Sequence, residues 1–167
     1  VVIGTGIGTV ADRTGTAAID IDAQLVVTGI NEGLEILGNA GANAIIGTNF
    51  DDVIDGGGGL DTLTGLLGND TYILDNVADT VSELGGGGRD KVVIAGNFNY
   101  TLAADFEDLT LQGTQAGQSG TGNALDNVII GSSANNALSG LDGNDTINGG
   151  GGIDSLSGGS GNDTFAF

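Results

Sequence analysis

Aspartates at nine-residue spacing are the residues of this 167-residue chain that could do chemistry. Each follows a Gly-rich stretch and precedes a short stretch of apolar or β-branched residues, and Asn takes the same place in some copies. Oxygen ligands repeated at a fixed spacing suit the binding of a hard cation. The positions are Asp52, Asp61, Asp70, Asp79, Asp90, Asp145, Asp154 and Asp163, with Asn43, Asn127 and Asn136.

These side chains recur with a period of nine residues. From Gly38 the sequence reads GNAGANAII, GTNFDDVID, GGGGLDTLT and GLLGNDTYI, and from Gly122 it reads GNALDNVII, GSSANNALS, GLDGNDTIN, GGGGIDSLS and GGSGNDTFA. The shared pattern is G-G-x-G-x-D-x-U-x, in which U is a large apolar residue. Gly at the first, second and fourth places permits a tight turn with positive φ. The last three places predict a strand of about three residues.

Two such nines make one coil of eighteen residues: strand, turn, strand, turn. Coils that stack by parallel strand pairing, about 4.8 Å apart, predict an all-β fold, a parallel β-roll or β-solenoid. Helix should be nearly absent, because no apolar period of about 3.6 residues is sustained. The predicted inward column comprises Ile45, Ile54, Leu63, Tyr72, Ile129, Leu138, Ile147, Leu156 and Phe165.

Residues eighteen apart lie one above the other in this coil. Stacked carboxylates about 5 Å apart repel each other, and a cation between the turns removes the conflict. Oxygen-only ligands, turn carbonyls included, favour Ca²⁺ over Mg²⁺. The alternative is that Asp and Asn only satisfy turn N–H groups, which does not require their recurrence every nine residues. The expected stacks are Asp52 on Asp70, Asp145 on Asp163, Asn43 on Asp61, Asn127 on Asp145 and Asn136 on Asp154.

These nines resemble the RTX repeats, over residues 38–73 and 122–166. The block from Asp75 to Thr121, with DNVADTVSELGGGGRDKVV and YTLAADFEDLTLQG, resembles the spacers between RTX arrays of large secreted bacterial proteins. The resemblance implies a parallel β-roll, calcium held between successive turns, and export as an unfolded chain by type I secretion. It implies that the sixth-place aspartates are ligands, joined by the fourth-place carbonyls of Gly59, Gly68, Gly143, Gly152 and Gly161.

Some copies depart from the pattern. The repeats that begin at residues 38 and 131 lack Asp, so their sites should be weaker or empty. The 74–82 unit keeps Asp79 but has no Gly, which weakens an Asp61–Asp79 site. Asp90 and Asp108 are eighteen apart, but Leu109 does not suit the register that follows.

Four segments organise the chain: irregular N-terminal coils at 1–37, a first array at 38–73, irregular spacer coils at 74–121 and a second array at 122–167. Residues 31–38 resemble residues 106–113, and the arrays that follow resemble each other with one extra nine in the second copy. Outside the arrays, the strand candidates are Val1–Ile3, Ala17–Ile19, Leu25–Val27, Val92–Ile94, Tyr100–Leu102 and Leu109–Leu111.

Composition excludes several classes of protein. Without His or Cys there is no Ser-His-Asp triad, Cys nucleophile, disulfide, HExxH zinc site or zinc finger. Three basic residues against 22 acidic ones, a net charge of −19, argue against nucleic acid as a partner. No apolar run approaches the roughly 18 residues of a membrane span. A hydrophobic content of 39% argues against disorder, and the lack of Met indicates a piece of a larger protein.

The charge also predicts how the chain folds. Ordering the backbone costs about 1–2 kcal/mol per residue, so a chain at −19 is not expected to fold on short strands alone. About five or six calcium ions would offset more than half of the charge. The free energy of calcium binding then becomes free energy of folding, with an unfolded calcium-free chain and a folded calcium-bound one.

Three other readings have weaker support. Gly4–Gly8 has the spacing G-x-G-x-G rather than that of a dinucleotide loop, and no helix pattern follows. Asp51–Asp52 and Glu107–Asp108 could be a carboxylate pair of a glycosidase or lyase, but Asp52 already belongs to the repeat. Phe98, Tyr100 and Phe106 could stack on sugars, although such residues more often fill an irregular core. We therefore expect this segment to be non-catalytic.

Two roles remain for the parent protein. We expect a secreted or cell-surface structural or adhesive protein; the alternative is a secreted protease, lipase or polysaccharide-modifying enzyme that carries this segment as its export and folding module. The expected partners are calcium ions and a surface polysaccharide bridged by calcium. End-to-end self-association into filaments is also expected, because neither end shows the polar cap that solenoids need.

Overall fold

The computed structural model describes residues 8–11, 15–23, 32–85 and 87–166. The chain divides into two compact units, Val1–Asp90 and Lys91–Phe167. The elements of the described residues are all strands, and every pair of hydrogen-bonded strands with a defined register is parallel. Both units are β-solenoids, which confirms the predicted fold.

In the first unit the chain alternates between two parallel sheets, one of order β1-β3-β5-β7 and one of order β2-β4-β6-β8. Within the array the register step is one coil of eighteen residues, as in the pairing of Ile45 with Leu63. The first coil is longer, since Asp20 pairs with Ala44. The strands are β1 (Gly8–Ala11), β2 (Asp20–Asp22), β3 (Leu34–Leu37), β4 (Ala44–Ile46), β5 (Val53–Asp55), β6 (Thr62–Thr64), β7 (Thr71–Leu74) and β8 (Thr80–Ser82).

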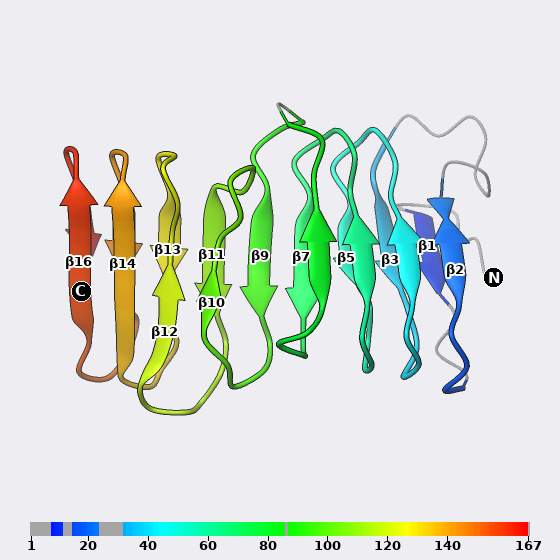
Figure 1. Ribbon diagram of the computed structural model, residues 1–167, viewed down its shortest axis with the longest axis horizontal. Helices are drawn as coiled ribbons and strands as arrows, with labels where there is room; N and C mark the ends of the chain where they lie inside the picture. Colours follow the sequence, from blue (N-terminus) through cyan, green and yellow to red (C-terminus); the bar gives the residue numbers. More distant parts are fainter. Residues whose placement is uncertain (1–7, 12–14, 24–31, 86, 167) are drawn as a thin grey trace. The chain divides into compact units, whose positions relative to one another are not determined.

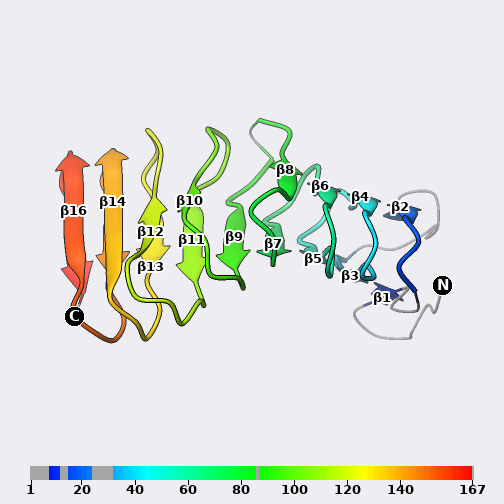
Figure 2. The same cartoon turned by 60° about the horizontal axis from the view of Figure 1, so that its bottom comes forward.

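The second unit repeats this plan, with sheets of order β9-β11-β13-β15-β17 and β10-β12-β14-β16. In Figure 1, β12, β14 and β16 point upward whereas β9 and β13 point downward, as a coiling chain requires. Figure 2 shows the turns that join the two layers. The strands are β9 (Lys91–Ile94), β10 (Tyr100–Thr101), β11 (Asp108–Leu111), β12 (Gln118–Thr121), β13 (Val128–Ile130), β14 (Asn136–Asp142), β15 (Thr146–Asn148), β16 (Ser155–Ser160) and β17 (Thr164–Ala166).

Each core is a stripe of eighth-place side chains between the two sheets. Successive strand residues point to opposite faces, so the middle residue of a three-residue strand is buried and its neighbours face outward. Leu156 is half-buried and Phe165 is exposed, because β16 and β17 are edge strands of their sheets. The other seven predicted inward residues are buried: Ile45, Ile54, Leu63, Tyr72, Ile129, Leu138 and Ile147.

Outside the arrays, the strand predictions for Val92–Ile94, Tyr100–Leu102 and Leu109–Leu111 are confirmed by β9, β10 and β11. The prediction for Ala17–Ile19 is wrong. The strand begins at Asp20 because Ile21, and not Ile19, is buried in register with Ile45.

As expected, Leu109 does not suit a register in which Asp108 has the sixth place: Leu109 is itself the buried inward residue and pairs with Val92. The step between β9 and β11 is one residue shorter than eighteen, so Lys91 pairs with Asp108. Val1–Ile3, Leu25–Val27 and all of the Gly4–Gly8 loop except Gly8 lie outside the described residues. No helix in the part of the chain described here is long and apolar enough to cross a membrane.

The apolar stripe predicts a contrast between two isoleucines. Ile147→Ala, in β15, removes a fully buried side chain and should lower the free energy of unfolding by about 2–5 kcal/mol. Ile153→Ala alters a turn side chain that is 82% exposed and should change the free energy of unfolding by less than about 0.5 kcal/mol. Urea denaturation in saturating calcium measures both, and equal losses would contradict the assignment of the core.

Candidate metal centres

The sixth-place side chains form columns at the ends of the turns, where the strands begin, and all of them are buried except those of Asp154 and Asp163. Along each column the backbone N–H of one sixth-place residue donates to Oδ1 of the Asp one coil later. The donor and acceptor atoms are 2.7 Å apart for Asp52 and Asp70, and 3.1 Å apart for Asp145 and Asp163. The remaining steps join Asn43 to Asp61, Asp61 to Asp79, Asp70 to Asp90, Asn127 to Asp145 and Asn136 to Asp154. All five predicted stacks are therefore present.

Two kinds of turn differ in whether the N–H of the second place donates to the sixth-place side chain. In the closed turns, the second-place N–H donates to the sixth-place side chain, as Thr48 does to Asp52 Oδ2 at 2.6 Å. In the open turns, the second-place residue has a positive φ instead. The closed turns begin with Gly38, Gly47, Gly122 and Gly131, and the open turns carry Gly57, Leu66, Leu141, Gly150 or Gly159 at the second place.

The open turns leave carboxylate oxygens without a donor. Oδ2 of Asp61, Asp70 and Asp145 is buried and has no hydrogen-bond partner. A buried, unpaired carboxylate oxygen is costly and calls for a positive partner. Two of these turns place a leucine at positive φ, which is strained for a residue with a bulky side chain. The donor set, all oxygen and partly anionic, fits a hard cation.

The closed turns satisfy their side chains without an ion. Asn127 Oδ1 accepts from the N–H of Asn123 at 2.8 Å, and its Nδ2 donates to the carbonyl of Glu107 at 3.1 Å. Asn43 and Asn136 are bonded in the same manner. Asp52 also has both oxygens occupied, by the Thr48 N–H and hydroxyl and by the Leu34 N–H. Turn hydrogen bonding thus accounts for these four places but not for the open turns.

The five glycines expected to contribute carbonyls share a positive φ, as a fourth-place turn residue requires. The Gly59 carbonyl already accepts from Asn76 Nδ2 at 2.8 Å. Asp154 and Asp163, in the last coil, are half-buried. The glycines are Gly59, Gly68, Gly143, Gly152 and Gly161.

The irregular spacer keeps the column at two places. Asp61 N–H donates to Asp79 Oδ1 at 3.0 Å, although the 74–82 unit has no Gly. Asp70 donates to Asp90 at 2.8 Å across twenty residues rather than eighteen. Asp108 is not at a sixth place, because it begins β11 as the partner of Lys91. The eighteen-residue spacing between Asp90 and Asp108 therefore does not build a site.

Sequence reasoning missed a second, exposed ladder at the fifth place. Here the N–H of the later coil donates to the side-chain oxygen of the earlier coil, as from Asn69 to Asp51 and from Asn144 to Asp126, both at 2.7 Å. These bonds lower the pKa of Asp51. Asp and Asn recur at the fifth place in the sequence, so their nine-residue spacing could have predicted this ladder. The ladder satisfies turn N–H groups and leaves the sixth-place oxygens to the column.

Burial raises the pKa of four column carboxyls, those of Asp52, Asp61, Asp70 and Asp145. The effect is largest at Asp70, where burial and the neighbouring charges of Glu83 and Asp52 raise the pKa to about 8. The pKa values of Asp52, Asp61 and Asp145 are also raised, mainly by burial. Burial therefore opposes the ionisation of these four carboxyls where no cation is bound.

The comparison with protein families agrees with this geometry. Residues 37–72, 121–156 and 139–166 match the family described as the RTX calcium-binding nonapeptide repeat. The chain carries RTX repeats. Both the resemblance seen in the sequence and the calcium-binding character of the repeats are thereby confirmed. No curated protein and no solved structure matched the chain.

Of the residues in the other interpretations, Asp52 belongs to the column, and the Glu107 carbonyl accepts from the column residue Asn127. Asp51 is exposed on the fifth-place ladder, and Glu107 and Asp108 are half-buried at the start of β11. Of the three aromatic residues, Phe106 is in the core, whereas Phe98 and Tyr100 are partly exposed.

The raised pKa values predict that acid stabilises the calcium-free fold. A carboxyl whose pKa is higher in the folded state binds more protons there, so the free energy of unfolding falls as pH rises. This contribution is complete below the ordinary carboxyl pKa of about 4 and is lost, for Asp70, as pH rises through about 8. Far-ultraviolet circular dichroism of metal-stripped protein should therefore show more residual strand signal at pH 5 than at pH 8. More strand signal at pH 8 would contradict the burial of these carboxyls.

Proposed function

We propose that the open turns bind calcium and that this binding drives folding of the chain, which is a segment of a secreted or cell-surface structural or adhesive protein. The buried Oδ2 atoms of Asp61, Asp70 and Asp145 carry the proposal, because they have no hydrogen-bond donor. The calcium-binding character of the matched repeats supports it independently.

The proposed ligands follow the column. Each ion takes sixth-place carboxylate oxygens and fourth-place carbonyls, for about five or six ions per chain. The closed turns contribute least, since their side chains are already hydrogen-bonded. The strongest proposed ligands are Asp61, Asp70, Asp145, Asp154 and Asp163 with Gly59, Gly68, Gly143, Gly152 and Gly161; Asp79 and Asp90 extend the set, and Asp52, Asn43, Asn127 and Asn136 have the weaker places.

Folding depends on calcium in this proposal because the column forms only in the coiled state. The chain has a net charge of −19, and its column carboxylates are buried one above another. Strands of three or four residues offer little stability of their own. Calcium supplies the missing positive charge, so its binding free energy becomes folding free energy.

The role of the parent protein is proposed from the repetition itself. Regular coils make up the arrays of both units, which suits a stalk or surface layer. An export and folding module of a secreted enzyme is the alternative, and a catalytic domain in the flanking sequence would favour it. Calcium could also bridge the acidic surface to an anionic polysaccharide, and coils of separate chains could associate end to end.

Self-association has a direct measurement. Light scattering over a concentration series in saturating calcium should show mass growing with concentration. A monomer throughout that series would contradict end-to-end assembly, and would leave the proposed calcium sites untouched.

A pair of substitutions tests the calcium sites. Asp145→Asn removes a buried column carboxylate, whereas Asp126→Asn removes the same charge from the exposed fifth-place ladder. Isothermal titration calorimetry should find about one calcium ion fewer per chain in D145N, or clearly weaker binding, and no such change in D126N. Equal losses would indicate that only net charge matters, and an unchanged D145N would rule out the column as the ligand set.

A further inference from the structure

Glu83 occupies a place that the nonapeptide pattern reserves for Gly. Ser82 pairs with Thr64, so Glu83 is the register neighbour of Gly65, a first-place glycine. Gly stands at the first place of every nonapeptide in both arrays. A Cβ on Gly65 would lie 2.6 Å from Glu83 Oε1 and closer still to Asp70 Oδ2. The Glu83 carboxylate therefore reaches the space beside the column that a first-place glycine leaves open.

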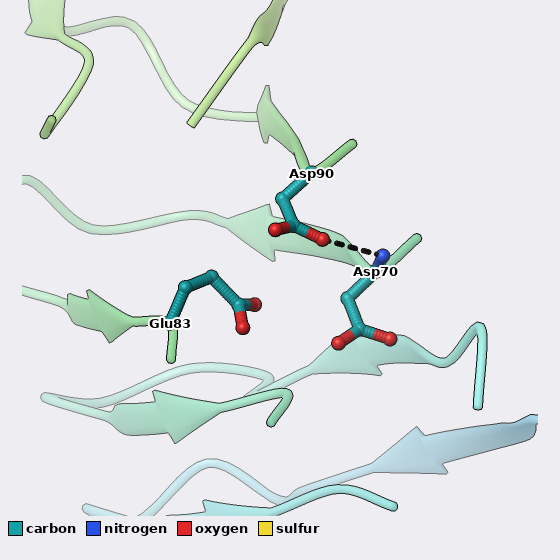
Figure 3. A group of neighbouring side chains, drawn as sticks. All are labelled: Asp70, Glu83 and Asp90. Carbon is teal, nitrogen blue, oxygen red and sulfur yellow. Dashed lines mark hydrogen bonds between the residues drawn. The ribbon is translucent and has the colours of Figure 1, made fainter. Parts of the chain in front are cut away.

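Three carboxylates meet there (Figure 3). One potential ligand atom from each of Asp70, Glu83 and Asp90 lies within 4.8 Å of the others. Asp70 and Asp90 are each only 1% exposed, and Asp70 Oδ2 has no hydrogen-bond partner. The Tyr72 hydroxyl donates to Glu83 Oε1 and so holds this side chain at the cluster.

We propose that Asp70, Glu83 and Asp90 form a calcium site of their own, in which Glu83 is a third carboxylate ligand that the nonapeptide pattern does not supply. The site rests on the proposed function, because it binds the same ion and because Asp70 and Asp90 are also residues of the column. Its Glu ligand comes from the twenty-residue coil that joins Asp70 to Asp90, two residues longer than the regular coil. The site therefore belongs to the irregular end of the first unit rather than to an array.

The spacing is compatible with calcium. Ca²⁺ binds oxygen at about 2.3–2.6 Å, so two of its ligands can lie up to about 5 Å apart. Ligand atoms within 4.8 Å of one another can thus share one calcium ion with little movement. Burial and the charge of Asp90 raise the pKa of Glu83 to about 7, which agrees with a cluster that lacks positive charge.

Tyr72 provides a reporter for this site. Tb³⁺ substitutes for Ca²⁺ and emits when a nearby tyrosine is excited, and the chain has two tyrosines and no tryptophan. In a Tyr100→Phe background, which removes the other tyrosine, we expect saturable terbium emission that a further Tyr72→Phe abolishes. A Y100F chain without saturable emission would have no ion near Tyr72 and would overturn the proposal.

Substitutions of Glu83 then separate this site from the neighbouring column. Glu83→Gln should weaken terbium binding, read from this emission, by about tenfold, whereas the matched control Glu35→Gln in β3 should titrate like the parent chain. If E83Q does not regain its strand signal in calcium, Glu83→Asp is read instead, with weaker binding expected because the side chain is shorter. If E83Q binds terbium as tightly as the parent chain, the proposed site is overturned. Where E83Q does not fold, the same result for E83D overturns it.

The two proposals fail in different ways. A parent chain whose strand content ignores calcium contradicts the proposed function, whatever Glu83 does. A parent chain that folds with calcium while Glu83 variants bind terbium normally contradicts only this site.

Discussion

Buried carboxylates stacked along the coil are the constraint on which this structure depends. The column works as a hydrogen-bonded ladder through one oxygen, because each Oδ1 accepts the N–H of the preceding coil. The hydrogen bonding of the second carboxylate oxygen of each column aspartate determines whether a cation is needed. Where the turn donates to it, the coil is complete; where the turn does not, a cation is needed.

The second place of each nonapeptide sets which of these turns forms. Thr48 keeps an ordinary φ and donates its N–H to Asp52, whereas Leu66 takes a positive φ and does not donate to Asp70. Strain at a leucine is tolerated where the surrounding coil fixes the turn. An aspartate at the sixth place is therefore not sufficient for a site, and Asp52 is the example.

The fold could be predicted from the sequence because its period fixes both the coil length and the inward face. Ile54 and Ile147 are buried for the same local reason, so neither needs knowledge of distant contacts. The spacer could not be placed in the same way. In the spacer, strand pairing and not the nine-residue period determines the register. As a result Asp108 lies in a strand, and the coil from Asp70 to Asp90 is two residues longer than the regular coil.

The sequence predicted the residues of the column but did not distinguish the open turns from the closed turns. The distinction between open and closed turns depends on backbone φ, and a Thr or Leu at the second place does not reveal it directly. Glu83 was missed because the 74–82 unit and the stretch after it lack the regular nine. Its position follows only once Ser82 is paired with Thr64.

Far-ultraviolet circular dichroism, recorded with calcium, after its removal by excess chelator and after its return, tests the central claim most directly. The account predicts that strand signal is lost on chelation and restored by calcium, because the open turns cannot bury their carboxylates without an ion. A strand signal that persists unchanged through chelation would contradict it.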